Sequence, residues 1–183
     1  YQCDWSSDVC SSDLNTVIRS TVGLTQDPPV PCMDNNLAYM PVESIARLVH
    51  GDLASMLPGG IASLYVQMLH PRAIAGVAQH PRFRDDPLGR MLQTANFIGR
   101  TTYGTQQEAL AQIERVKAVH EAVRGTTDHG EPYAAGDPDL LLFVHCAEIS
   151  MFLAGYRRWG RDAISDLEAD HYVDEMAAIA VES

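Results

Sequence analysis

Apolar residues recur at helical spacing along most of the chain from Pro41 onward. The first run comprises Ile45, Leu48, Val49, Leu53 and Met56. We expect the Pro58-Gly59-Gly60 sequence to break this helix. The mostly apolar segment 61–69 then predicts a buried helix, and Pro71 begins a short helix that ends near His80.

Capping residues set the limits of the next two helices. Asp86-Pro87 offers an N-cap followed by a proline in the first turn, and this helix is expected to end before Gly104. The residues Thr105 to Glu108 form a capping box, which places the start of the following helix. That helix should run to Arg124, because Gly125 is a normal C-terminal signal.

The last part of the chain predicts two more helices. A polar loop, 126–136, leads to a second Asp-Pro start at Asp137-Pro138, and the most apolar helix of the chain then ends at Trp159-Gly160. A final helix over 165–181 should bury Leu167, Tyr172, Met176 and Ile179. No strand is convincing, so we expect an all-α, globular bundle of roughly six to eight helices.

The beginning of the chain requires separate treatment. Residues 4–14, DWSSDVCSSDL, match one reading frame of a standard short-read sequencing adapter, so we interpret residues 1–14 as non-native. Residues 15–40 are expected to be irregular, and 41–183 to form one helical domain that is cut at its C-terminus. Because the native start is then missing, no leader can be read, and the cytoplasm is only the default compartment.

Composition and charge narrow the possible partners. The net charge of −11 argues against binding to nucleic acid or to anionic membranes. We see no apolar run of about 18 residues, so no transmembrane segment is expected. Outside the adapter segment only Cys32 and Cys146 remain, which excludes a disulfide framework or a zinc ribbon. P-loop, dinucleotide-binding and nucleophile-elbow motifs are also missing.

His120 is the first candidate for chemistry. It shares one helix face with Ile113, Val116 and Val123, which places an imidazole in an apolar stripe. Such a histidine can ligate haem iron through one ring nitrogen. Periodicity alone favours the alternative, a core histidine whose hydrogen bonds are satisfied.

Arg90 and Thr94 lie four residues apart, beside Phe97, and border the apolar face of the preceding helix. This cation and hydroxyl could bind haem propionates or polarise dioxygen. The alternative is a solvated helix flank with an arginine that extends toward water.

His145 and Glu148 lie three apart in the most apolar helix, where a buried carboxylate requires a metal or an ion-pair partner. A helical di-iron site needs two Glu-x-x-His motifs, whereas the chain has only Glu168-x-x-His171.

Several short words occur in a fixed order between Pro41 and Met176. They are Val49-His50-Gly51-Asp52, Gln67-Met68-Leu69-His70-Pro71, Phe83-Arg84-Asp85-Asp86-Pro87-Leu88-Gly89-Arg90, Thr102-Tyr103-Gly104, Arg115-Val116-Lys117-Ala118-Val119-His120, Asp137-Pro138-Asp139-Leu140-Leu141 and Val144-His145. The ordered set resembles the bacterial and fungal family of the rubber oxygenase (latex-clearing protein) and the MpaB-type oxygenases.

The resemblance implies an all-helical oxygenase that carries a b-type haem in its rubber-cleaving members. His120 falls on the iron ligand of the family's Arg-x-x-His-x-His-x-Arg stretch, and Arg124 keeps its last position. Lys117 replaces an arginine there, and Ala122 replaces the second histidine.

On the distal side the family has Arg-x-x-Lys-Thr. Arg90 and Thr94 match, while Gln93 replaces the lysine. Because groups around the ligands tune redox potential and dioxygen handling, the replacements argue against carrying over rubber-type cleavage.

We therefore expect a haem-dependent oxygenase that takes dioxygen and a hydrophobic small-molecule or polymer substrate, possible classes being isoprenoids and other alkenes. Arg90 and Thr94 would be catalytic, and His120, Lys117 and Arg124 would hold haem b. Two alternatives remain open. One is a non-haem metal site formed by His145, Glu148 and His70, and the other is a non-enzymatic helical module that binds a ligand or partner.

Overall fold

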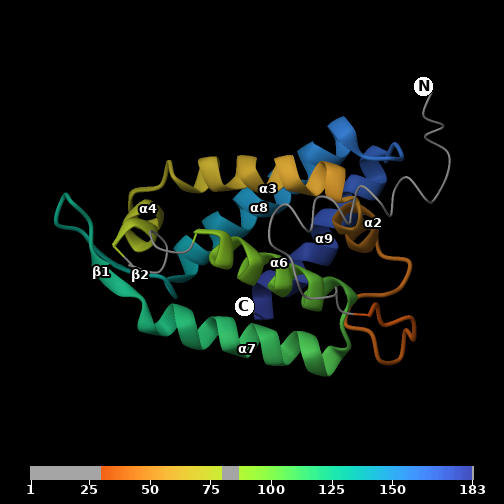
Figure 1. Ribbon diagram of the computed structural model, residues 1–183, viewed down its shortest axis with the longest axis horizontal. Helices are drawn as coiled ribbons and strands as arrows, with labels where there is room; N and C mark the ends of the chain where they lie inside the picture. The colour runs from red at the N-terminus through yellow and green to blue at the C-terminus, as the bar shows by residue number, and fades with distance from the viewer. Residues whose placement is uncertain (1–29, 80–86, 183) are drawn as a thin grey trace.

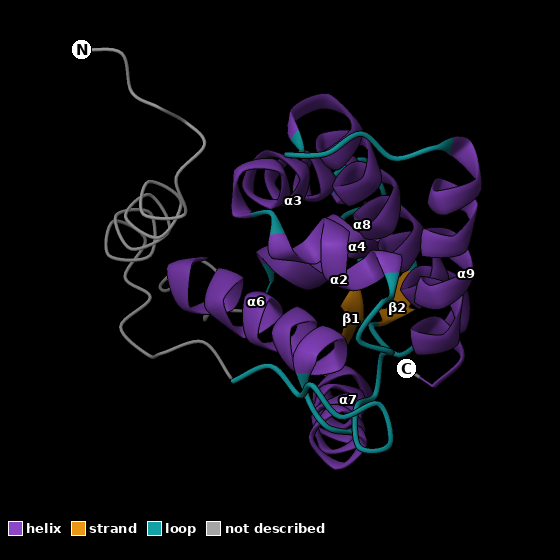
Figure 2. Ribbon diagram, turned by 90° about the vertical axis from the view of Figure 1, so that its right-hand side faces the viewer, coloured by secondary structure: helices purple, strands orange, loops and turns teal. Residues whose placement is uncertain are grey.

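The computed structural model describes residues 30–79 and 87–182, which form an all-α bundle with one small hairpin. The helices are α2 (Ile45–Gly51), α3 (Leu53–Gln67), α4 (Pro71–Ala78), α6 (Pro87–Tyr103), α7 (Gln106–Ala122), α8 (Pro138–Trp159) and α9 (Asp166–Glu182). Helix α8 lies at the centre, with α3 on one side and α9 on the other (Figure 1). Figure 2 shows the α6–α7 pair on a further side of the bundle. The seven helices within the described ranges confirm the predicted fold class.

The caps expected from the sequence begin the helices where their residues are described. The Thr105 hydroxyl accepts from the Glu108 backbone N–H, and the Glu108 carboxylate accepts from the Thr105 N–H at 2.9 Å, which completes the capping box. The Asp137 carboxylate accepts from the Asp139 N–H at 3.1 Å, and α8 ends before Gly160 as predicted. Asp86, the other expected N-cap, lies outside the described residues.

The predicted helix break at Pro58-Gly59-Gly60 is wrong. The chain breaks at Asp52 instead, where the carboxylate caps α3 by accepting from the Ser55 N–H at 3.2 Å. Helix α3 then continues through Pro58 to Gln67. Gly59 is needed for contact with α8, because a Cβ at this position would lie 2.8 Å from the Met151 carbonyl oxygen.

The expectation that 61–69 is a buried helix is also wrong. The side of α3 that packs on α8 carries the small buried residues Ser55, Gly59 and Ser63. Most of the larger apolar residues within 61–69 point outward instead, and Leu69 is 82% exposed. Close approach of the two backbones therefore selects small residues for the interface and leaves the large ones in solvent.

A short hairpin replaces the polar loop expected over 126–136. The strands β1 (Arg124–Thr126) and β2 (Pro132–Ala134) pair antiparallel, with Gly125 opposite Tyr133. Tyr133 is buried, and its hydroxyl donates to the Gln79 side-chain oxygen at 3.0 Å. Because β1 begins at Arg124, α7 ends at Ala122, earlier than predicted.

The main core joins α2, α8 and α9. Its buried members are Met40, Ala46, Val49, Ile149, Phe152, Tyr156, Tyr172, Met176 and Ile179. Three of the four α9 residues predicted to be buried are among them, but Leu167 is 65% exposed. Contrary to our expectation, one described helix, α8, is long and apolar enough to cross a membrane by length and composition. Helix α8 packs against α3 and α9, and 33% of its apolar window is buried within the described fold.

Candidate functional site

The α6–α7 hairpin positions the residues expected to hold a cofactor. The two helices are joined only by Gly104 and Thr105, and they lie close together near this connection, while the start of α6 diverges from α7 (Figure 2). Gly104 permits this tight connection, because a Cβ there would collide with the Arg100 carbonyl oxygen. The segment with Arg90 and the segment with His120 each lie at the end of their helix that is remote from this connection, where the two helices diverge (Figure 2).

His120 occupies the last turn of α7 and is half-buried. Of the stripe predicted to be interior, only Ile113 is in the core, at 2% exposure, whereas Val116 and Val123 are half-buried like His120. The prediction of an interior histidine is thus only partly correct. Among the described residues α7 packs extensively against α6 alone, which leaves the end of α7 near the surface.

The cations that flank His120 have local partners. Lys117 Nζ lies 3.5 Å from Glu114 Oε1, one turn earlier on α7. Arg124 Nε donates to the Glu121 carbonyl oxygen at 3.2 Å. Both cations lie close to solvent, where such interactions contribute little to stability and leave the side chains able to reorient.

Arg90 and Thr94 lie one turn apart on the first half of α6. Thr94 is half-buried, and the side chain of Arg90 lies outside the described residues. The backbone therefore places these residues on the half of α6 that diverges from α7 (Figure 2), and the structure does not test their predicted distal role.

Within the part of the chain that the structure describes, His70 and His145 each bury a ring nitrogen that has no hydrogen-bond partner, Nδ1 in His70 and Nε2 in His145. The His70 ring lies 4.8 Å from the ring of Phe143. Burial lowers the pKa of His145, an effect opposed by a hydrogen bond with the Met176 backbone. His145 is therefore neutral at neutral pH.

Glu148 lies near α9, where its charge helps to raise the pKa of Tyr172. Within residues 30–79 and 87–182, no three His, Cys, Asp or Glu side chains lie close enough together to hold a metal ion. The structure thus does not bring His70, His145 and Glu148 together as one ligand set.

A buried polar cluster that the sequence did not single out joins α2, α6 and α9. His50 Nδ1 lies 2.8 Å from Thr102 Oγ1, and His50 Nε2 lies 3.0 Å from the Tyr172 hydroxyl. Burial lowers the pKa of His50 to about 3, so the ring is neutral. Burial also raises the pKa of Tyr172 above its usual range, and Glu148 adds to this effect.

Both nitrogens of His50 are used within the fold, so this histidine is a structural link rather than a metal ligand. In the sequence, His50 and Thr102 occurred only as members of the short motifs that resemble the family, and neither was predicted to have a role. A histidine directly after a buried apolar run was the one available signal, since its partners are distant in sequence.

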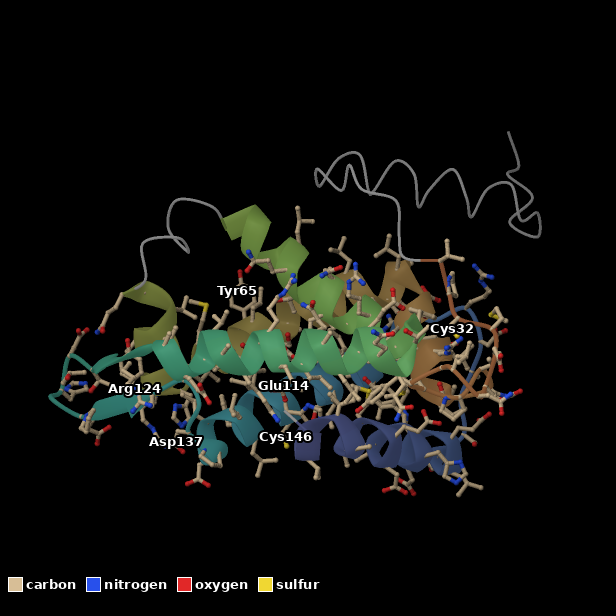
Figure 3. The ribbon with its side chains drawn as sticks, turned by 90° about the horizontal axis from the view of Figure 1, so that it is seen from below. Cys32, Tyr65, Glu114, Arg124, Asp137 and Cys146 are labelled. Carbon is tan, nitrogen blue, oxygen red and sulfur yellow. The ribbon has the colours of Figure 1, made fainter. Side chains whose placement is uncertain are left out.

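The two cysteines differ in their surroundings. Cys32 is half-buried, and its thiol lies 3.6 Å from the Asp34 carbonyl oxygen. Cys146 is exposed on α8, although it lies within an apolar helix. Figure 3 shows these two residues far apart, so they form no pair.

Comparison with known proteins supplies the remaining evidence. The family model described as the catalytic domain of the ER-bound oxygenase MpaB/B′ and the rubber oxygenase matches residues 47–181. Searches of curated proteins and of solved structures found no match. The matched span contains both helices of the hairpin and most of the core, and it confirms the resemblance seen in the sequence. The chain belongs to the family of MpaB and rubber-oxygenase catalytic domains.

Proposed function

We propose that this oxygenase-family domain is a haem-dependent oxygenase that acts on a hydrophobic substrate, and that His120 is the proximal iron ligand. The observation that carries the proposal is the family match over residues 47–181, together with the positions at which His120, Arg90 and Thr94 fall on the family's motifs. The family supports an oxidoreductase, while the haem and the substrate belong to the proposal.

The end of α7 offers an imidazole beside apolar side chains. A haem site needs an axial ligand and an apolar slot for the macrocycle. His120 is half-buried, Val116 and Val123 beside it are also half-buried, and Val119 is 56% exposed. The valines beside His120 would supply apolar contacts to the macrocycle.

The roles of the neighbouring residues follow from their charge and position. Lys117 and Arg124, one on each side of His120, would pair with the two propionates. Bound haem iron would supply binding and activation of dioxygen. The Arg90 cation and the Thr94 hydroxyl would stabilise negative charge on the oxygen side.

Dioxygen consumption tests this function. We expect the haem-loaded protein to consume dioxygen when an isoprenoid alkene is added, and Thr94→Val to lower the rate about 100-fold to 1,000-fold, since loss of one such donor costs about 2.7–4 kcal/mol. Thr126→Val, on exposed strand β1, is the matched control and should retain the rate. Equal rates for the two variants would remove Thr94 from the site. Absence of substrate-dependent uptake in haem-loaded protein would contradict the oxygenase function.

A further inference from the structure

A hydrogen bond between a phenol and an imidazole joins α9 to α2 inside the fold. The Tyr172 hydroxyl lies 3.0 Å from Nε2 of His50, and Nδ1 of the same ring lies 2.8 Å from the Thr102 hydroxyl. Tyr172 and Thr102 are each 0% exposed. A neutral imidazole accepts at one nitrogen and donates at the other. The tautomer that carries its hydrogen on Nδ1 therefore accepts the phenolic O–H at Nε2 and donates to Thr102.

The acceptor distinguishes Tyr172 from two other tyrosines that donate hydrogen bonds within the fold. Tyr103 donates to the Arg47 carbonyl oxygen at 2.7 Å, and Tyr133 donates to the Gln79 side-chain oxygen at 3.0 Å. An amide oxygen accepts a hydrogen bond but is too weak a base to take up the proton. An imidazole nitrogen at hydrogen-bond distance can take it up, as it does in general base catalysis. Tyr172 therefore has a base in contact with its proton, whereas these bonds of the other two tyrosines offer none.

Two carboxylates give the surroundings of Tyr172 a negative charge. Burial raises the pKa of Tyr172 above its usual range, and the charges of Glu148 on α8 and Glu175 on α9 add to this effect. Glu175 is held in place, because its carboxylate accepts from the Ala46 N–H at 2.8 Å. The same charges that oppose loss of a proton to water favour loss of an electron, since they attract the positive charge that is left behind.

Loss of an electron turns the phenol into a strong acid. Burial lowers the pKa of His50 to about 3, which opposes protonation of the ring. A phenol radical cation is nevertheless a stronger acid than this imidazolium, so the proton moves from oxygen to nitrogen along the 3.0 Å hydrogen bond. The imidazolium that forms lies in the negative field of Glu148 and Glu175, which offsets part of the cost of burying its charge.

We propose that Tyr172 is a redox-active residue that gives up an electron to a one-electron oxidant and its proton to His50. The O–H bond of Tyr172 breaks, an N–H bond forms at His50 Nε2, and the oxidant is reduced by one electron. The products are a neutral tyrosyl radical and an imidazolium whose Nδ1–H donates to Thr102. Return of one electron and of the proton restores the phenol and the neutral ring. None of these residues is assigned to haem, so the proposal stands or fails independently of the proposed function.

Photo-oxidation of the full chain without haem tests the proposal. An illuminated tris-bipyridine ruthenium(II) complex with persulfate supplies ruthenium(III) as the one-electron oxidant, and electron paramagnetic resonance after a dark delay detects radicals that persist. We expect a persistent tyrosyl signal in the parent protein and its loss in Tyr172→Phe. Tyr133→Phe is the matched control, because it changes a buried tyrosine with an amide acceptor, and it should retain the signal. Persistence of the signal in folded Tyr172→Phe, or a parent protein without it, would overturn the proposal.

A second variant and a second measurement test the role of His50. Glutamine keeps a hydrogen-bonding side chain at this position but cannot take up a proton, so His50→Gln should lose the persistent signal although Tyr172 is present. Circular dichroism establishes that the variants are folded. In the parent protein the radical should show hyperfine coupling to the transferred proton, and this coupling should vanish after unfolding and refolding in D₂O. A persistent signal in folded His50→Gln, or a parent radical without exchangeable coupling, would contradict proton transfer to His50.

Discussion

The close crossing of α3 and α8 provides the sharpest test of the fold, through the substitution Gly155→Ala. A Cβ at Gly155 would lie 2.7 Å from the Ser55 carbonyl oxygen and 3.3 Å from the Gly59 Cα atom. Both contacts are with backbone atoms, which cannot rotate away. Alanine can fit only if the two helices separate.

Two opposing effects set the magnitude. Alanine is favoured over glycine within a helix by about 1 kcal/mol. Overpacking of a tight interface costs about 1–3 kcal/mol, and rigid backbone contacts place this site in the upper part of that range. We therefore expect a net loss of about 1–2 kcal/mol in the free energy of unfolding. In a domain of this size each kcal/mol lowers Tm by about 2–4 °C.

Gly60→Ala is the matched control on the same helix crossing. Its Cβ would lie 3.6 Å from Phe152 Cε1, an ordinary contact, so the helix preference should raise Tm slightly. Differential scanning calorimetry of the two variants measures the difference. The reasoning is refuted if Gly155→Ala melts at or above the Tm of the parent protein.

Three further predictions concern caps and the buried cluster. Thr105→Ala removes the capping box of α7 and should cost about 1 kcal/mol in chemical denaturation, whereas an unchanged midpoint would show that this cap is unimportant. Tyr172→Phe leaves His50 Nε2 without its hydroxyl partner and should cost about 1–3 kcal/mol, and a neutral effect would contradict the hydrogen bond. Burial lowers the pKa of His50 from 6.5 to about 3, so the unfolded state binds this proton more tightly. The His50 contribution to stability should therefore decrease as pH falls from 6.5 toward 3, and His50→Gln should flatten the pH profile of the unfolding free energy over that range.

Local chemistry was enough to predict most helix limits. Thr105, Asp137 and Gly160 begin or end helices through interactions with residues only a few positions away. The errors arose where contacts between residues far apart in the sequence determine the local structure. Gly59 was interpreted as a break because its partner, the backbone of α8, is remote in sequence. The strand Arg124–Thr126 is too short to show alternation, and its partner strand is needed to define it.

In the candidate site, too, local sequence predicted some features while tertiary packing determined the others. Sequence pattern placed Arg90 and Thr94 on one helix and His120 on the next, because capping residues and apolar spacing are local signals. Pattern alone could not give the exposure of His120, which depends on how little of the described fold covers the end of α7. It also could not join His50 to Tyr172, since only tertiary packing brings α2 and α9 together.

The most direct test of the account is the absorption spectrum of the protein purified after expression with a haem supply. We predict a Soret band that is lost in His120→Ala and retained in His129→Ala, an exposed histidine between β1 and β2 that serves as the control. A Soret band that persists in folded His120→Ala would contradict the assignment of the ligand. A folded parent protein that shows no band, even after reconstitution with haem, would contradict the haem-dependent function itself.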